Sequence, residues 1–195
     1  MAVLRLMAGI VMVGLGAAIV GCGGETAAPP AAAASSTTAA PGSQVLRDLR
    51  ADWQAQNDTM VKIADAMPEG KFGYKTTPPQ RNYGEQIMHV ALTNVELLKL
   101  LGGKAAAPTL TVESAKTKAD ILKALADSYD YGTALLNEES ETTIGQPLAD
   151  SPPWLGPASR ARIMWTLLAH TMDIYGQMAV YLRMNGIVPP ASRGV

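Results

Sequence analysis

The chain has 195 residues, of which 48% are hydrophobic and 17% charged, so it can form one domain with a buried core. Its net charge of −1 gives no surplus of basic side chains for a phosphate backbone, which excludes nucleic-acid binding as the main role. Cys22 is the single cysteine, so no intrachain disulfide can form and the fold must rest on packing.

Residues 1–21 have the pattern of a secretion signal. Arg5 precedes an apolar run that ends in "IVGC", with a small residue directly before Cys22. Short apolar runs of this kind are signal peptides and not membrane-spanning helices. The ending resembles a bacterial lipobox, which implies cleavage before Cys22 and lipid attachment to its sulfur. The alternative is an ordinary signal peptide or an uncleaved anchor, with Cys22 incidental.

Residues 22–42 predict a flexible tether. They consist almost entirely of small residues and prolines, and nothing among them is large enough to bury, so their ordering entropy would not be offset. Gly23 follows the cysteine where an aspartate would signal retention in the inner membrane, which favours the periplasmic side of the outer membrane. We therefore expect an exported domain that is lipid-anchored in the bacterial cell envelope.

Residues 43–193 show apolar side chains at helical spacing and no sustained alternation with a period of two. The stripes predict helices over residues 43–67, 79–101, 114–137 and 158–186. Pro68 and the pair Gly102-Gly103 supply stop signals, and a proline-rich loop precedes the last helix. The expected fold is all-α, an antiparallel four-helix bundle with long connecting loops.

The last predicted helix is apolar around most of its circumference. A helix of that kind is buried on several sides, either at the centre of the bundle or against a second subunit. We therefore expect a homodimer.

The two histidines of the chain lie on different predicted helices. His89 belongs to a polar stripe, with Glu85 one turn before it. The stripe either faces water or lines a polar cleft in which His89 is a metal ligand. His170 lies among apolar neighbours with Asp173 beside it, and is either a core residue satisfied by one hydrogen bond or a second ligand.

Two segments, "MPEGKFGYKTTPPQRNYGEQIMHVALTNVELL" (67–98) and "LAHTMDIYGQMAVYLRMNGIVPPASR" (168–193), resemble the DinB-like (YfiT-like) superfamily of metalloenzymes. The resemblance implies a four-helix bundle, often dimeric. It also implies three histidines that hold a divalent metal such as nickel, zinc or iron. His89 and His170 match two of these ligands, and the third position falls on Ile174, which cannot coordinate a metal.

Two functional hypotheses follow for this centre. In the first, it is degenerate, holds no metal or a weakly bound divalent ion (Ni, Zn, Fe or Mn), and the domain is a binding or interaction module. In the second, His89 and His170 with a carboxylate from Glu85 or Asp173 form the site of an active metal-dependent hydrolase or transferase. A purely structural envelope protein, dimerising through its last helix, is a further alternative. The sequence names no substrate.

Overall fold

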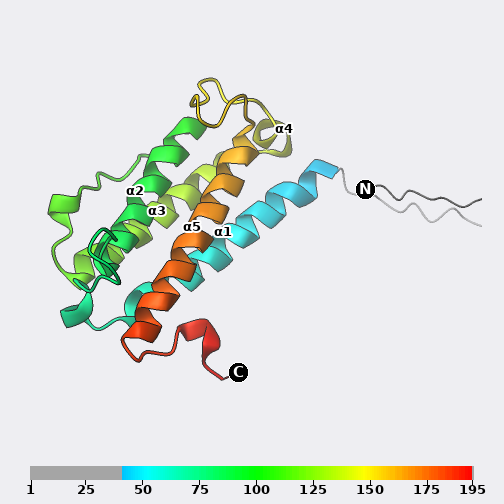
Figure 1. Ribbon diagram of the computed structural model, residues 1–195. Helices are drawn as coiled ribbons and strands as arrows, with labels where there is room; N and C mark the ends of the chain where they lie inside the picture. The colour runs from blue at the N-terminus through cyan, green and yellow to red at the C-terminus, as the bar shows by residue number, and fades with distance from the viewer. Residues whose placement is uncertain (1–40, 195) are drawn as a thin grey trace, which may run out of the picture. The chain divides into compact units, whose positions relative to one another are not determined.

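The computed structural model describes residues 41–194, with side chains from residue 44 onward (Figure 1). The helices of this part are Pro41–Ala66 (α1), Tyr83–Leu98 (α2), Lys118–Glu138 (α3), the short Glu141–Ile144 (α4) and Arg160–Met184 (α5). No strand occurs among the described residues, and the expected all-α four-helix bundle is confirmed. The signal segment, Cys22 and most of the tether lie outside the described residues.

The long helices run in two directions, and not every neighbouring pair is antiparallel. The Tyr181 hydroxyl at the end of α5 donates to the carbonyl of Arg81 at the start of α2, so these two helices are antiparallel. α2 and α3 instead run parallel, because Gly84 contacts Ile121 near the start of both helices and Leu98 contacts Gly132 near the end of both. The antiparallel arrangement expected from the sequence therefore holds between α2 and α5 but not between α2 and α3, because residues 99–117 form a long connection that returns along the bundle (Figure 1).

Side-chain caps explain why two helices begin later than their apolar stripes predict. Asn82 accepts a hydrogen bond from the Glu85 N–H at 2.8 Å, while the Glu85 carboxylate accepts from the Asn82 N–H at 2.7 Å. Thr117 and Asp120 form the same reciprocal box at the start of α3. Each box satisfies N–H groups that a helix end leaves free, so α2 begins at residue 83 and α3 at residue 118.

α1 and α3 pack closely around a tryptophan. The Trp53 indole N–H donates to the carbonyl of Tyr129 at 3.1 Å, and the two rings lie 4.7 Å apart. Gly132 permits this approach, because a Cβ atom at that position would stand 2.3 Å from a Trp53 ring carbon. Shape complementarity at this one glycine therefore fixes the distance between the two helices.

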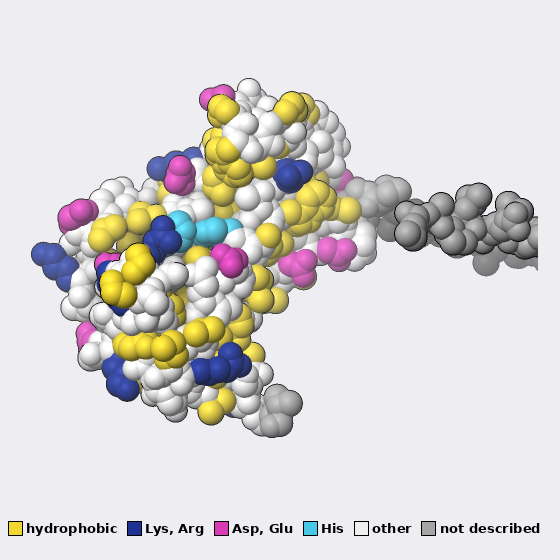
Figure 2. All heavy atoms as spheres, in the orientation of Figure 1, with side chains coloured by type: hydrophobic (Ala, Val, Ile, Leu, Met, Phe, Trp, Pro, Cys, Tyr) yellow, Lys and Arg dark blue, Asp and Glu magenta, His cyan; other side chains and the backbone are white. Residues whose placement is uncertain are grey.

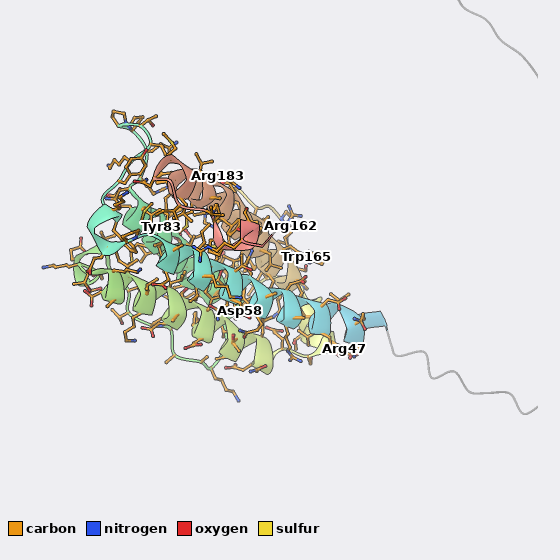
Figure 3. The ribbon with its side chains drawn as sticks, turned by 90° about the horizontal axis from the view of Figure 1, so that it is seen from below. Arg47, Asp58, Tyr83, Arg162, Trp165 and Arg183 are labelled. Carbon is orange, nitrogen blue, oxygen red and sulfur yellow. The ribbon has the colours of Figure 1, made fainter. Side chains whose placement is uncertain are left out.

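One face of α5 packs into the bundle and another face is apolar but exposed. Leu167, Ile174 and Met178 are buried, whereas Trp165 and Met172 are 52% and 49% exposed. Figure 3 shows Trp165 on the outer side of the helix. The expectation that α5 is buried on several sides therefore fails within one chain, since α5 takes one place in a ring of four helices. None of the helices described has the length and hydropathy needed to cross a membrane.

Candidate functional site

His89 on α2 and His170 on α5 face each other across the antiparallel pair. Their Nε2 atoms are 3.1 Å apart, and the two rings stand at 76° with centroids separated by 4.9 Å. Both side chains are partly buried. The structure thus brings together two residues that are 81 positions apart in the sequence.

The separation of the two nitrogens is compatible with two ligands of one ion. If each nitrogen lies about 2.0 to 2.1 Å from a metal, the nitrogens are about 3.0 Å apart at a right angle and about 3.4 Å apart at the tetrahedral angle. The observed 3.1 Å falls in this interval. The two imidazole nitrogens can therefore supply two of the ligands that a divalent metal ion needs.

The two candidate carboxylates have other partners. Glu85 is held by the Asn82 N–H at the start of α2 and pairs with Lys75 at 3.7 Å. Asp173 accepts a hydrogen bond from Gln177 at 3.0 Å. Among the described residues no three His, Cys, Asp or Glu side chains are grouped so as to hold a metal ion. Neither carboxylate therefore joins the two histidines as a third ligand.

A buried glutamine fixes the arrangement beside His170. Gln86 is fully buried and donates to the Gln177 side chain at 2.8 Å, and Gln177 in turn donates to Asp173. This relay orients Asp173 along α5. Sequence reasoning missed Gln86, since polar residues are common on helices. The available signal was its position in the helical repeat, which places Gln86 on the apolar side of α2 among buried residues.

Ile174 lies one turn after His170 and is only 3% exposed. Residues four positions apart share a helix face, so the isoleucine side chain is on the side of α5 that carries His170. Its apolar branches contribute to the core of the bundle. Ile174 therefore places hydrocarbon where a third ligand would stand.

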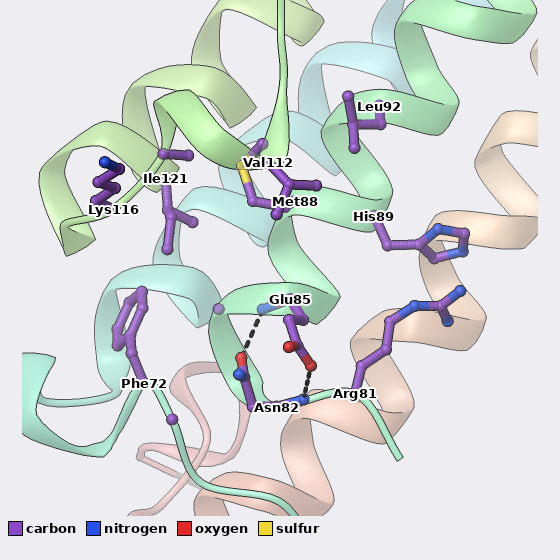
Figure 4. A pocket seen from close by; sticks show the side chains of 13 residues that line it. Phe72, Arg81, Asn82, Glu85, Met88, His89, Leu92, Val112, Lys116 and Ile121 are labelled. Carbon is purple, nitrogen blue, oxygen red and sulfur yellow. Dashed lines mark hydrogen bonds between the residues drawn. The ribbon is translucent and has the colours of Figure 1, made fainter. Parts of the chain in front are cut away.

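Arg81, which sequence reasoning also missed, gives the site a positive charge. Burial lowers the pKa of His89, with further lowering by the Arg81 guanidinium and by His170. Burial also lowers the pKa of His170, where the nearby Asp173 opposes the effect and Arg81 adds to it. Arg81 makes no ion pair with any described residue, and its side chain extends beside His89 (Figure 4). The positive charge of Arg81 beside the histidines disfavours the binding of a metal cation.

A pocket of about 530 Å³ opens beside His89. It lies between the first turns of α2, the connection that follows α2, and the start of α3. Figure 4 shows its apolar lining, which includes Phe72, Met88, Val112 and Ile121. In Figure 2 the histidines reach the surface next to a Lys or Arg side chain on one side and an Asp or Glu side chain on the other. The site is thus an accessible depression lined by both apolar and charged side chains.

The sequence profile of the DinB superfamily matches residues 52–178, which include both histidines and Ile174. The chain belongs to the DinB superfamily. Its fold is similar to that of a DinB-like protein from Bacillus cereus, with a TM-score of 0.65 and 16% identity over 74% of this chain and 95% of that one. A DinB-like protein from Bacillus subtilis is similar at a TM-score of 0.56 and 12% identity, over 71% and 92% of the two chains. A comparison of this chain with curated proteins gave no significant match.

DinB superfamily proteins are often associated with a metal ion, so the donor set of this chain can be tested against that property. A catalytic metal centre in general has three protein ligands and an open position. Here His89 and His170 offer two nitrogens, and the next position on the same helix face is the buried Ile174. Arg81 adds a repelling charge. The residues present therefore do not fit a resident three-ligand metal.

Proposed function

We propose that this protein is a lipid-anchored binding module of the cell envelope, built on a DinB domain whose metal centre is degenerate. The observation that carries the proposal is the donor set around His89 and His170. Two imidazoles converge there without a third ligand among the described residues, and Ile174 and Arg81 occupy its surroundings. The adjacent pocket remains as the concave surface on which a partner or small molecule can bind.

Lipid attachment at Cys22 and the periplasmic side of the outer membrane are parts of the same proposal. They rest on the signal-like residues 1–21 and on the ending "IVGC". We propose in addition that two copies associate through the exposed apolar face of α5, where Trp165 and Met172 lie. Exposed apolar side chains of this size, gathered on one helix, are typical of an interface between subunits.

A metal-dependent hydrolase or transferase is the second candidate. The 3.1 Å separation of the two Nε2 atoms favours it, since that distance suits two ligands of one ion. For this candidate a carboxylate must move toward the pair, and we propose Asp173, whose charge already raises the pKa of His170. The move would break the bond from Gln177.

Metal analysis of the purified protein, prepared without a histidine tag, tests the proposal. The protein is incubated in turn with excess nickel, zinc, iron(II) and manganese, dialysed, and its metal content measured beside that of His89→Ala and His170→Ala. We expect far less than one ion per chain in all three proteins. One ion per chain that both variants lose would overturn the degenerate centre and support the enzyme. Mass spectrometry of the N-terminal peptide tests the lipid on Cys22 in the same preparation.

A further inference from the structure

We propose that the pocket beside His89 binds a small amphipathic oxyanion, with its carboxylate or phosphate head at Arg81 and its apolar body against Phe72, Met88 and Ile121. This inference rests on the proposed function, since it names the kind of ligand that the binding module takes. The pocket volume of about 530 Å³ lies within the range of about 300 to 1,000 Å³ that is usual for small-molecule sites.

The apolar walls come from four separate segments of the chain. Phe72 precedes α2, Met88 lies on α2, Val112 lies on the connection that returns along the bundle, and Ile121 lies on α3. Figure 4 shows these side chains around the same space. Val112 is 57% exposed although it is aliphatic. An apolar body placed here would cover Val112 and remove its surface from water, which stabilises the bound state.

The charged side chains around the pocket favour an anion. Arg81 and Lys116 line it, and neither forms an ion pair with a described residue. Glu85 is the one acidic residue of the lining, and its carboxylate is already held by the Asn82 N–H and by Lys75. Two cations without partners beside a neutralised carboxylate leave a net positive charge for the ligand to meet.

The start of α2 borders the pocket, but its backbone is not free to bind the head group. The N–H of Tyr83 donates to the carbonyl of Tyr74, that of Gly84 to Phe72, and that of Glu85 to the Asn82 side chain. All three groups have their partners within the protein. Recognition of the anion therefore falls to side chains, above all to the Arg81 fork, whose planar N–H groups match a carboxylate or a phosphate.

The backbone of Arg81 is anchored to α5 by a hydrogen bond. Its carbonyl accepts the hydrogen bond from Tyr181 at 2.6 Å, which fastens the residue to the end of α5. The guanidinium is left free and extends beside His89 (Figure 4). A ligand head between Arg81 and His89 would thus lie at the position that the family resemblance associates with a metal. The centre would have changed from one that binds a cation to one that binds an anion.

Calorimetric titration of the full protein with alkyl probes tests the inference. Octanoate and octyl phosphate present the two head groups, while octanol and octylammonium present the same chain without a negative charge. We expect at least one of the two anions to bind in a one-to-one complex, and octanol and octylammonium to bind about tenfold more weakly or not at all. The preference between the two anions assigns the head group.

Two substitutions with matched controls locate the site. Arg81→Gln removes the free charge, and Arg162→Gln is its control because Arg162 is exposed on α5 outside the pocket (Figure 3). Val112→Asp alters the apolar wall, and Val188→Asp is its control because Val188 is equally exposed, at 55%, and outside the pocket. We expect each pocket variant to weaken anion binding about tenfold and each control to leave it unchanged.

The inference is overturned if no anion binds, if octanol binds as well as the anions, or if Arg81→Gln binds them as tightly as the wild type. Metal analysis of the same preparation separates this result from that of the proposed function. A metal-free protein that binds no anion contradicts the inference alone. A metal-loaded protein contradicts the proposed function, and anion binding that still depends on Arg81 would then leave the ligand class standing.

Discussion

Ile174 and Arg81 together decide the chemistry that His89 and His170 can support. Ile174 offers no ligand atom, and the Arg81 guanidinium adds a positive charge beside the histidines, which in the proposed centre would favour an anion over a metal cation. Only the first of these changes can be read from the sequence, because it falls at a motif position. Arg81 precedes α2 and belongs to no periodic stripe, so its approach to His89 becomes visible only when the helices are packed.

The two histidines should make folding stability depend on pH. Burial and Arg81 lower both pKa values below the ordinary 6.5, so the unfolded chain binds these protons at a pH at which the folded chain does not. The contribution of the two histidines to stability is therefore fully present above about pH 6.5. It is lost as the pH falls below this value toward the pKa values of the folded state. Urea unfolding at about pH 7.5 and about pH 5 should show a larger loss in the wild type than in the double variant His89→Gln, His170→Gln. An equal loss in the two proteins would contradict this.

Two buried hydroxyl groups should respond to removal by different amounts. Thr171 is fully buried on α5, and its hydroxyl interacts with the Tyr129 hydroxyl in a geometry short of a full hydrogen bond, so Thr171→Val should change the free energy of unfolding by less than about 0.5 kcal/mol. Ser128 donates to the Leu125 carbonyl at 2.7 Å and accepts from Asn94, so Ser128→Ala should lower it by about 1 to 2 kcal/mol. Chemical denaturation measures both, and a Thr171→Val variant that is destabilised as much as Ser128→Ala would contradict the difference.

At the scale of the helices, the sequence predicts the long elements well and their directions poorly. The apolar stripes locate all four long helices, since a helix must bury one side. Their first residues depend on the Asn82 and Thr117 boxes, which a stripe does not contain. The parallel course of α2 and α3 depends on the path of residues 99–117, which have no periodicity from which a direction can be deduced.

The packing of α1 on α3 predicts contrasting effects of one methyl group. Gly132→Ala would place a Cβ against the buried Trp53 ring and should lower the free energy of unfolding by about 1 to 3 kcal/mol. Gly176→Ala, inside α5 with open space around it, should raise it by about 0.5 to 1 kcal/mol through helix propensity. Thermal unfolding followed by circular dichroism compares them. Similar changes in both variants would show that helix propensity, and not the contact with Trp53, governs position 132.

At the scale of the whole molecule, the exposed apolar face of α5 predicts association. If Trp165 and Met172 lie in a homodimer interface, Met172→Lys should shift the sedimentation coefficient to that of the monomer, because a buried lysine without a partner is costly. Val112→Lys is the control, since Val112 lies on the connection after α2 and is just as exposed. A wild-type monomer, or a dimer that survives Met172→Lys, would contradict an interface on this face.

The family, and with it the bundle, can be recognised from the sequence, because the segments around His89 and His170 carry the resemblance. The pocket cannot, since its lining comes from four segments that only the fold brings together. The amide relay from Gln86 to Asp173 is equally hidden, because it joins α2 to α5 through side chains with no motif of their own.

The metal content of the wild type and of Ile174→His tests whether the metal centre is degenerate, with circular dichroism to show that both proteins are folded. If the centre is degenerate because a third ligand is missing, the wild type should hold far less than one ion per chain. Ile174→His should then gain about one ion, which a further His89→Ala change removes. A wild type that already holds one ion, lost in His170→Ala, would contradict a degenerate centre. A folded Ile174→His that gains no ion would show that the missing ligand is not the cause.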